Sequence, residues 1–353
     1  MASDPDPVEI ELWHTLAERL RPTVPDAVAD AVAGADPRSG RVEESGQFHR
    51  VLVVPDVAVL RMTRLQEAGA APGSSWSRRN SPAAHLPRRM RLLEALAAQR
   101  PPFALPEPLT EVVCTREDDE PLTAAVLQRF VPGQAHPPHD GDPATLRWVL
   151  DALAAVDVTA PELAPQLSGP HDFRGPWTDE RVERVLGLPR FLAERDVMAS
   201  FAFDGLPRPW EPTVRAVLDR VRRWHETPPV TPGLVHGDLA GHNMLWQPRP
   251  GGRDTDGAPG VEWRLRGVLD WDLAHAGDPA RNLAYLGLWH GERQIDAVAA
   301  SPAEAARARV WLAAASLDAL DDARARHETT GRPLRWAKLL RTTLPRIVHA
   351  AAR

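Results

Sequence analysis

The chain has 353 residues, of which 43% are hydrophobic and 25% are charged, a balance typical of a folded globular protein rather than a disordered or membrane-embedded one. This length suits two lobes or two domains better than one minimal core. The net charge of −6 disfavours a broad basic surface for nucleic acid, and the sequence contains no run of about 20 apolar residues that would span a membrane.

The single cysteine, Cys114, excludes an intrachain disulfide and any metal site built from several cysteines. The first residues, MASDPDPVEIELW, are acidic and contain no apolar segment of the kind that directs secretion. We therefore expect a cytoplasmic protein. The oligomeric state stays open.

Residues 1–40 are predicted to form an N-terminal helical extension. The segment EIELWHTLAERL, residues 9–20, has the spacing of a short amphipathic helix, and an alanine-rich segment follows and ends near Gly34. The sequence assigns no role to this extension.

Residues 41–131 are predicted to form a small, sheet-rich, nucleotide-binding lobe. The segment HRVLVVPDVAVLRMT, residues 49–63, contains two β-rich runs around Pro55–Asp56, which indicate a hairpin. Two more strands are expected on either side of an acidic turn. They are LTEVVCT at 109–115 and LTAAVLQRFV at 122–131.

Two further segments lie between these strand pairs. Residues 66–87 are rich in Ala, Ser, Pro and Gly without a helical or strand period, so they are predicted to be a mobile surface insertion. Residues 88–99, RRMRLLEALAAQ, are predicted to form a helix.

Residues 132–353 are predicted to form a larger, mainly α-helical lobe, because apolar residues recur in it at helical spacing. The predicted helices lie at 146–156, 214–224, 303–327 and 334–350. Two short strands, at 243–246 and 263–271, flank a Gly/Pro/Asp-rich stretch that indicates a flexible loop. The predicted fold class is therefore α+β with two lobes.

The stretch LVHGDLAGHNMLW, residues 234–246, concentrates polar side chains between apolar flanks. Asp238 lies in a predicted turn, Asn243 opens a strand and Asp270 closes the next strand, so a hairpin would bring Asn243 and Asp270 together. One carboxylate and one amide oxygen, completed by water and phosphate oxygens, suit Mg²⁺. Asp238 would then accept the proton of an acceptor hydroxyl, as the base of a phosphotransferase does.

Two other interpretations stay open at this point. His236, Asp238 and His242 would be ligands for a transition metal in a hydrolase, although their spacing is not a strong zinc pattern. For each histidine alone, hydrogen bonding to the loop backbone is the simpler explanation. Alternatively, the chain would be a binding module that retains a nucleotide without transferring phosphate.

The same stretch, taken with GVLDWDLAHAGDPARNLAYL at 267–286, resembles the catalytic-loop and metal-binding motifs of the aminoglycoside phosphotransferase family. The fold of that family is similar to that of protein kinases. The resemblance covers roughly residues 40–290, and the combination of the two motifs is more specific than either alone.

The resemblance implies that ATP and Mg²⁺ are bound. It implies Asp238 as catalytic base, His236 as an organiser of the loop, and Asn243 and Asp270 as the Mg²⁺ ligands. Asp272 is a less certain contributor near the metal.

Asp278, in GDPARN, resembles a family aspartate that braces the catalytic loop. Asn282 stands where many members have another aspartate, which puts that brace in doubt.

The resemblance also extends into the small lobe. Gly46, in SGQFHRV, resembles a turn that covers phosphates, and VAVLRM resembles the strand that presents a cation to the α- and β-phosphates. That cation must be Arg61, because the only lysine in the chain is Lys338. An arginine keeps its charge and holds phosphate oxygens bidentately.

In the family, a glutamate on the following helix pairs with this cation. The register places Arg89 there, and Glu94 lies displaced on the same helix as a candidate partner of Arg61.

LQRFVPG, at 127–133, resembles the hinge between the lobes, where backbone groups near Gln128 and Phe130 would hold adenine. The choice between ATP and GTP stays open.

The sequence thus favours an ATP- and Mg²⁺-dependent O-phosphotransferase that modifies a hydroxyl of a small molecule, such as an aminoglycoside, a macrolide or a related antibiotic. Acidic residues at 316–328 and 292–296 would attract a polycationic acceptor, although such charge runs are more often solvated helix faces. Tryptophans of the second lobe would offer an apolar platform to a bulky acceptor.

Overall fold

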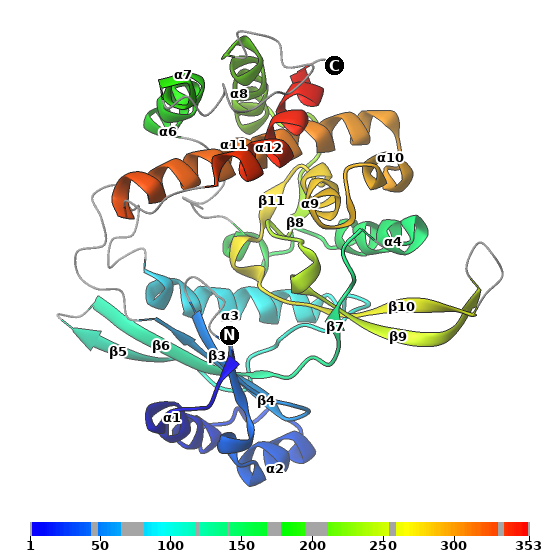
Figure 1. Cartoon of the computed structure of the whole chain (residues 1–353). Helices are drawn as coiled ribbons and strands as arrows, with labels where there is room; N and C mark the ends of the chain where they lie inside the picture. The colour runs from blue at the N-terminus through cyan, green and yellow to red at the C-terminus, as the bar shows by residue number, and fades with distance from the viewer. Residues whose placement is uncertain are drawn as a thin grey trace. The chain divides into compact units, whose positions relative to one another are not determined.

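The computed structural model (Figure 1) describes residues 2–43, 49–64, 81–117, 120–139, 141–167, 178–194, 211–253, 259–330 and 335–351. The chain divides into two compact units. The sheet unit comprises Met1–His136, Thr159–Leu167 and His242–Asp272, and the helical unit comprises Pro137–Val158, Ser168–Gly241 and Leu273–Arg353.

The sheet unit contains a six-stranded antiparallel sheet in the order β1-β2-β3-β4-β6-β5. Its strands are β1 (Ala2–Ser3), β2 (Arg41–Glu43), β3 (His49–Val54), β4 (Ala58–Thr63), β6 (Glu120–Arg129) and β5 (Val113–Glu117). The predicted hairpin at 49–63 is confirmed by the pairing of β3 with β4. Asp56 in its turn has φ 61°, a left-handed conformation that aspartate tolerates better than most residues, so the turn needs no glycine.

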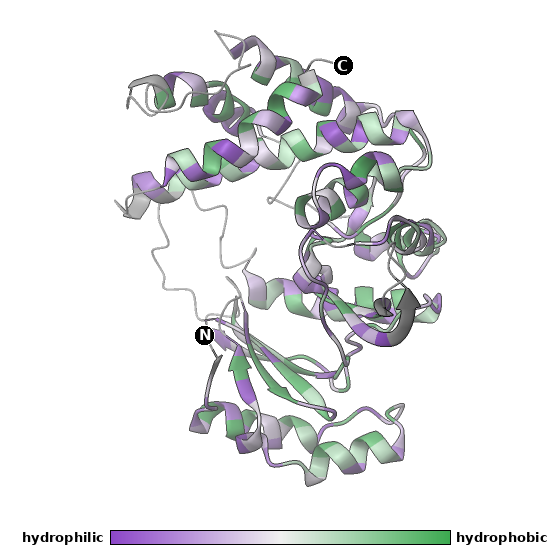
Figure 2. Cartoon of the chain, turned by 45° about the vertical axis from the view of Figure 1, so that its right-hand side comes forward, coloured by the Kyte–Doolittle hydropathy of each residue, from purple (hydrophilic) through white to green (hydrophobic). Residues whose placement is uncertain are grey.

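One face of this sheet is covered by the N-terminal extension. Alternate strand residues Leu52, Leu60 and Leu127 pack in one apolar core with the fully buried Trp13 and Leu16. The helices are α1 (Pro7–Ala17) and α2 (Asp26–Gly34), followed by the short 3₁₀ helix η1 (Pro37–Ser39). The two predicted helices are confirmed, and Figure 2 shows mostly hydrophobic colours on the strands that they cover. The extension is therefore part of the core of the sheet unit.

The opposite face of the sheet carries α3 (Pro82–Ala98), where Met90 lies 3.6 Å from the side-chain nitrogen of Gln128 on β6. This helix begins earlier than predicted, so the assignment of residues 82–87 to the insertion is wrong. Ser81 caps the helix by accepting a hydrogen bond from the Ala84 N–H (3.2 Å), and Pro82 suits the first helical position. The remainder of the insertion, up to residue 80, lies outside the described residues.

A long hairpin completes the sheet unit, together with the short helix α5 (Ala164–Leu167). Strands β9 (Met244–Arg253) and β10 (Pro259–Val268) pair along their lengths, and β7 (Gln134–Ala135) adds to β9. Most of the predicted flexible loop is therefore strand. β7 pairs only with the start of β9, and within the described residues no other strand pairs with that edge of β9. The prolines of β9 follow the paired stretch, and proline is tolerated on such an edge.

The helical unit is mainly α-helical, as predicted. Its helices are α4 (Pro143–Ala154), α6 (Asp179–Leu186), α7 (Leu188–Glu194), α8 (Glu211–Glu226), α9 (Ala280–His290), α10 (Gln294–Val298), α11 (Pro302–Thr330) and α12 (Trp336–Ala351). The four predicted helices are confirmed, with ends that differ by a few residues. Strands β8 (Gly233–Val235) and β11 (His275–Gly277) form a small antiparallel sheet beside α9 (Figure 1).

The segment His242–Asp272, which the sequence analysis placed in the lobe of residues 132–353, belongs to the sheet unit. A division into lobes at residue 131 remains a prediction. None of the helices in the described part of the chain is long and apolar enough to cross a membrane.

Candidate active site

The loop after β8 carries two of the predicted site residues, His236 and Asp238. His236 is fully buried, and its backbone N–H donates to Oδ1 of Asn282 (2.9 Å). Its ring nitrogen Nδ1 accepts a hydrogen bond from the backbone N–H of Asp238 (3.2 Å). The imidazole therefore fixes the backbone at Asp238, whose side chain is partly exposed.

The same loop contains a glycine that no other residue can replace without strain. Gly237 has φ 85°, and a Cβ atom there would lie 2.4 Å from the carbonyl oxygen of Leu273. The left-handed backbone and the close approach both require glycine. Gly237 therefore sets the direction in which the chain presents Asp238.

Asn282, at the start of α9, braces this loop. Its Oδ1 accepts from the His236 N–H, and its Nδ2 donates to the carbonyl oxygen of Leu234 (2.8 Å). An amide side chain both donates and accepts, whereas a carboxylate only accepts. Asn282 therefore braces the loop with both halves of its amide, which an aspartate in its place would not do.

Asp278 does not make the bond to the loop that the resemblance implied. Its carboxylate accepts from the Trp311 Nε1–H (2.9 Å) and the Ala280 N–H (3.0 Å), and it pairs with Arg307 (3.1 Å). Asp278 thus ties the start of α9 to α11.

Arg61, on β4 of the sheet unit, lies in a buried cluster of charged residues. Its Nη2 donates to Oδ2 of Asp272 (2.7 Å) and lies 3.7 Å from Oδ1 of Asp270. The same nitrogen is 3.1 Å from Nδ1 of His49. Arg61 is 8% exposed, so these contacts hold its guanidinium in one place.

Charges in this cluster keep its members in fixed protonation states. Burial opposes the ionisation of Asp272, but the positive charge of Arg61 and its hydrogen bond outweigh this and hold the Asp272 pKa well below its ordinary value. Burial, and then the Arg61 charge, lower the pKa of His49 to about 3. His49 is therefore neutral near pH 7 and accepts a hydrogen bond from Arg61.

Glu94 does not pair with Arg61, so that candidate pairing is wrong. Its carboxylate forms an ion pair with Arg21 of the N-terminal extension. Arg89 occupies the position expected for the glutamate and interacts electrostatically with Asp272, Arg61 and Asp270. The carboxylate that pairs with Arg61 comes from Asp272 instead of from α3.

The two predicted metal ligands lie at the same end of the β9–β10 hairpin. Asn243 closes the 3₁₀ helix η3 (Gly241–Asn243), and its carbonyl oxygen accepts from the Leu269 N–H (2.7 Å). Asp270 follows β10 with φ 57° and a side chain that is 50% exposed. The two residues thus come from adjacent backbone at one end of the hairpin, and a half-exposed carboxylate fits Mg²⁺, which takes few protein ligands and several water or phosphate oxygens.

The segment that carries Asp272 is held by aromatic residues. Asp272 lies in η4 (Trp271–Leu273), where the Trp271 Nε1–H donates to the Val268 carbonyl oxygen (2.9 Å). The Trp271 ring stacks with Phe103 at 6.3 Å between centroids. These contacts fix the backbone between Asp270 and Asp272.

The nucleotide-binding candidates outside the cluster have different surroundings. Gln128 is buried, its Nε2 donates to the Pro106 carbonyl oxygen (2.7 Å), and its backbone pairs with Val59 on β4. Phe130 directly follows Arg129, the last residue of β6. Gly46 lies outside the described residues.

The hydrolase interpretation has no support in the geometry. Within the described residues, no group of three or more His, Cys, Asp and Glu side chains is placed to hold a metal ion. The Nδ1 atom of His236 accepts a hydrogen bond from the loop backbone, which was the simpler explanation for this histidine.

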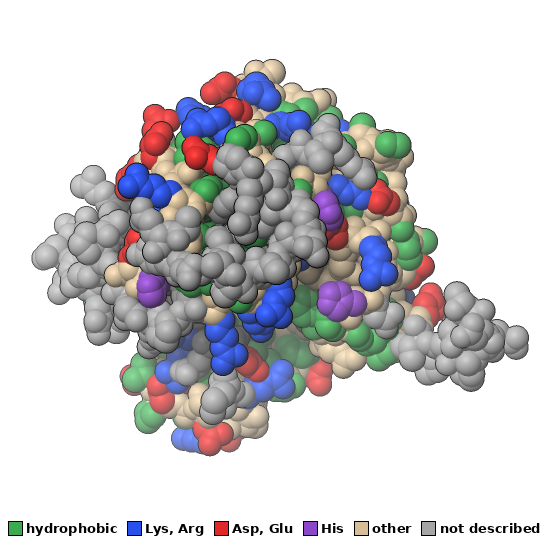
Figure 3. All heavy atoms as spheres, turned by 45° about the horizontal axis from the view of Figure 1, so that its top comes forward, with side chains coloured by type: hydrophobic (Ala, Val, Ile, Leu, Met, Phe, Trp, Pro, Cys, Tyr) green, Lys and Arg blue, Asp and Glu red, His purple; other side chains and the backbone are tan. Residues whose placement is uncertain are grey.

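The acidic residues of α11 do not form an open wall. Asp318 and Asp321 are buried and form ion pairs with Arg181 and Arg184 of α6. In the view of Figure 3, acidic and basic side chains are interspersed among the described residues. Charge attraction of a polycationic acceptor by these carboxylates is therefore not supported.

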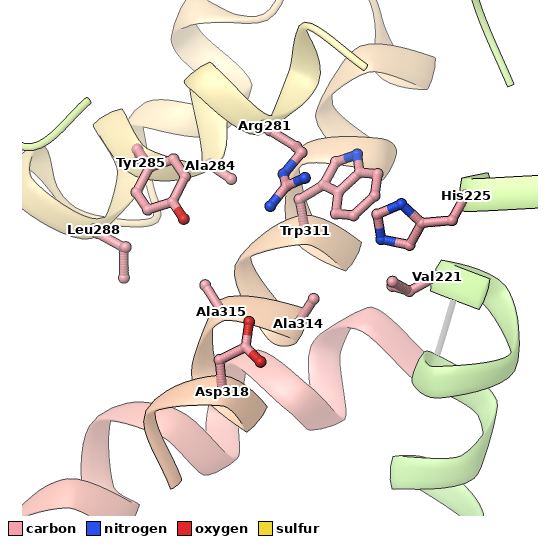
Figure 4. Close-up of a pocket in the computed structure, with 10 residues that line it drawn as sticks. All are labelled: Val221, His225, Arg281, Ala284, Tyr285, Leu288, Trp311, Ala314, Ala315 and Asp318. Atoms are coloured by element: carbon pink, nitrogen blue, oxygen red, sulfur yellow. The ribbon is translucent and has the colours of Figure 1, made fainter. Parts of the chain in front are cut away.

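A small pocket lies among α8, α9 and α11 (Figure 4). The Arg281 guanidinium stacks on the Trp311 ring at 4.6 Å, and His225 meets the same ring edge-on at 5.6 Å. Tyr285, the only tyrosine in the chain, lines the pocket from α9. The buried Trp311 thus belongs to the packing of the helical unit and not to an exposed platform.

Sequence reasoning missed His49, although the hairpin register contained the signal. Val51 pairs with Arg61 across the hairpin and His49 pairs with Thr63. Side chains two residues apart on a strand share a face, so His49 and Arg61 are diagonal neighbours.

Comparison with known proteins places these features in a family. The model of the phosphotransferase enzyme family matches residues 34–325. The viomycin phosphotransferase of Streptomyces vinaceus is 28% identical over 291 residues, which cover 82% of this chain and 83% of that protein.

Among solved structures, the GDP complex of aminoglycoside 2′-phosphotransferase-IIIa aligns with a TM-score of 0.51 and 18% identity over 88% of this chain and 91% of the other. A streptomycin–ATP complex of another aminoglycoside phosphotransferase aligns with a TM-score of 0.53 and 13% identity over 98% and 99%.

At these identities the two structures show the fold alone. That fold is the two-lobed, protein-kinase-like α+β fold expected from the sequence. The family model covers most of the chain, including both motifs. The chain therefore belongs to the phosphotransferase enzyme family.

Proposed function

We propose that this enzyme transfers the γ-phosphoryl group of ATP to a hydroxyl of a small-molecule antibiotic in a Mg²⁺-dependent reaction. The observation that carries the proposal is the buried Arg61, held by Asp272 and His49 beside the half-exposed Asp270. A fixed cation next to a carboxylate and an amide suits a triphosphate and its metal ion.

In this proposal, Asn243 and Asp270 hold Mg²⁺, which would neutralise charge on the phosphate oxygens. Arg61 binds phosphate oxygens with its guanidinium, and backbone groups near Gln128 and Phe130 hold adenine. These residues position the nucleotide and stabilise charge, which are the main contributions expected in phosphoryl transfer.

Asp238 is the proposed base. The loop holds its backbone through His236 and Asn282, so its carboxylate has a defined position from which to accept the proton of the acceptor hydroxyl. Asp238 and Asn243 are five positions apart in the chain, so one short segment supplies both the base and a metal ligand. Because the reaction uses ATP, we expect it to take place in the cytoplasm.

The acceptor is proposed from the relatives. A viomycin phosphotransferase matches most of the chain, and the titles of the similar structures name aminoglycoside phosphotransferases. We therefore rank viomycin-type peptide antibiotics first and aminoglycosides second, ahead of macrolides.

The test is label transfer from γ-labelled ATP, with Mg²⁺, to viomycin, kanamycin, streptomycin and a macrolide in separate reactions. Label in one class of antibiotic, abolished by a chelator and restored by added Mg²⁺, is the expected result. ATP binding without transfer to any acceptor would favour a nucleotide-binding module. Tightly bound zinc in protein purified without chelator would instead favour the hydrolase.

A further inference from the structure

Arg89 is a charged residue on the buried face of helix α3. Leu86 and Leu93, one helical turn away on either side, are at most 2% exposed. The side chain of Arg89 therefore leaves α3 from its buried face, whereas Arg91, two positions later, is exposed.

That face of α3 is also the face of the sheet on which Arg61 lies. Along β4, the residues Ala58, Leu60 and Met62 point into the core with α1 and α2. Arg61 alternates with them and so points to the opposite side, where α3 covers the sheet. Arg61 contacts Asp272 and lies near Asp270, and Arg89, from α3, interacts electrostatically with the same two carboxylates.

The net charge of this cluster of Arg61, Arg89, Asp270 and Asp272 becomes positive when a metal ion binds. Arg61 and Arg89 carry two positive charges against the negative charges of Asp270 and Asp272. The carboxylate of Glu94, which would offset one arginine, is engaged by Arg21. When Asp270 binds a divalent cation, the cluster has a surplus of positive charge that matches a polyphosphate.

We propose that Arg89 is a second phosphate-binding residue, which contacts the polyphosphate chain of the nucleotide together with Arg61, and that Asp272 positions Arg61. The proposal rests on the proposed function. On this proposal α3 supplies a cation, Arg89, where the resemblance implied a glutamate. The carboxylate that pairs with Arg61 comes from Asp272 of η4.

The test compares Arg89→Met with Arg91→Met, since both remove a guanidinium from α3 but Arg91 is exposed. The dissociation constants of adenosine, ADP and ATP are measured for each variant by calorimetry with Mg²⁺ present. Arg89→Met is expected to weaken ADP and ATP binding by about tenfold or more, the effect of losing one charge-assisted contact, and to leave adenosine binding unchanged. Arg91→Met should change none of the three.

Equal loss of adenosine and ATP affinity would show that Arg89 only supports the fold and would overturn the proposal. Unchanged affinity for all three ligands would also overturn it. Arg89→Lys keeps the charge and serves as the second variant if Arg89→Met does not fold; it should bind ADP and ATP more weakly than wild type, because lysine lacks the planar guanidinium, and leave adenosine binding unchanged. Equal weakening of adenosine and ATP binding in Arg89→Lys would overturn the proposal.

Label transfer and nucleotide binding by the wild-type protein distinguish a failure of this inference from a failure of the proposed function. If wild type transfers label but Arg89→Met binds ATP normally, only the inference fails. If wild type binds neither ADP nor ATP, the proposed function fails and the inference fails with it.

Discussion

The loop around Asp238 and the cluster around Arg61 are built in different ways. The loop is held by its own neighbours in the chain and by Asn282, which is 46 positions from His236. The cluster joins β3, β4, α3 and η4, and Arg61 and Asp272 are 211 positions apart. A local motif therefore describes the loop almost completely, whereas the cluster exists only when the sheet unit is folded.

Removal of the Trp13 side chain should have the largest effect, because it removes packing on which the fold of the sheet unit depends. Trp13 is fully buried between α1 and the sheet, so Trp13→Ala should lower the free energy of unfolding by about 3–5 kcal/mol. ATP binding should weaken as the cluster loses its scaffold. Denaturant unfolding and ATP titration measure both effects, with the exposed Val8→Ala as control. Equal stability of the two variants would show that the extension is not part of the core.

Asp270→Asn should have the next largest effect, on the metal requirement. We expect the Mg²⁺ concentration for half-maximal activity to rise about 10- to 100-fold, the range for changes around a metal site. Asp56→Asn is a matched control, because Asp56 also has a left-handed backbone, with φ 61° against 57° for Asp270. A Mg²⁺ titration that is identical for both variants would rule out Asp270 as a ligand.

Asn282→Asp probes the loop with a smaller change. The variant loses the donor to the Leu234 carbonyl oxygen and places a carboxylate against it, which should cost about 1–3 kcal/mol and reduce turnover. ATP affinity, a property of the sheet unit, should stay the same. If Asn282→Asp were as stable and active as wild type, the donor bond would have no role in bracing the loop.

Substitution of His225 should give the smallest effect, a change in stability that is measurable only at acidic pH. Burial, and then the Arg281 charge, lower its pKa to about 4 from an ordinary value near 6.5. Between these values the unfolded chain binds the proton and the folded chain does not, so stability rises with pH in this window and falls as the pH drops from 6.5 to 4.

The slope of unfolding free energy against pH, from denaturant melts, should become flatter in His225→Gln between pH 6.5 and 4. His14→Gln, which makes the same change at an exposed position on α1, is the control for the substitution itself. An unchanged slope in His225→Gln would show that His225 takes up its proton in the folded protein as well.

The sequence was sufficient where the signal was periodic or local. Alternation around Pro55–Asp56 predicted the β3–β4 hairpin, and helical spacing predicted α8 and α11. The two motifs also identified His236, Asp238, Asn243 and Asp270 as residues to examine.

The sequence was misleading where tertiary contacts override composition. The composition of residues 82–87 favoured a surface insertion, yet these residues lie inside α3. The prolines of β9 favoured a loop, yet they lie in a strand. Glu94 was the acid nearest to the expected position, and its engagement by Arg21 depends on how the N-terminal extension packs. Charge pairing between distant segments has no periodic signal in one sequence.

The central claim, that Asp238 is the base of a phosphotransfer reaction, is tested most directly by the turnover number and ATP affinity of Asp238→Asn. Asp219→Asn, which makes the same change at an exposed position on α8, is the control. We predict that kcat of Asp238→Asn falls on the order of 10²–10⁴-fold while ATP affinity and the Asp219→Asn values stay near wild type. Wild-type turnover in Asp238→Asn would contradict the account.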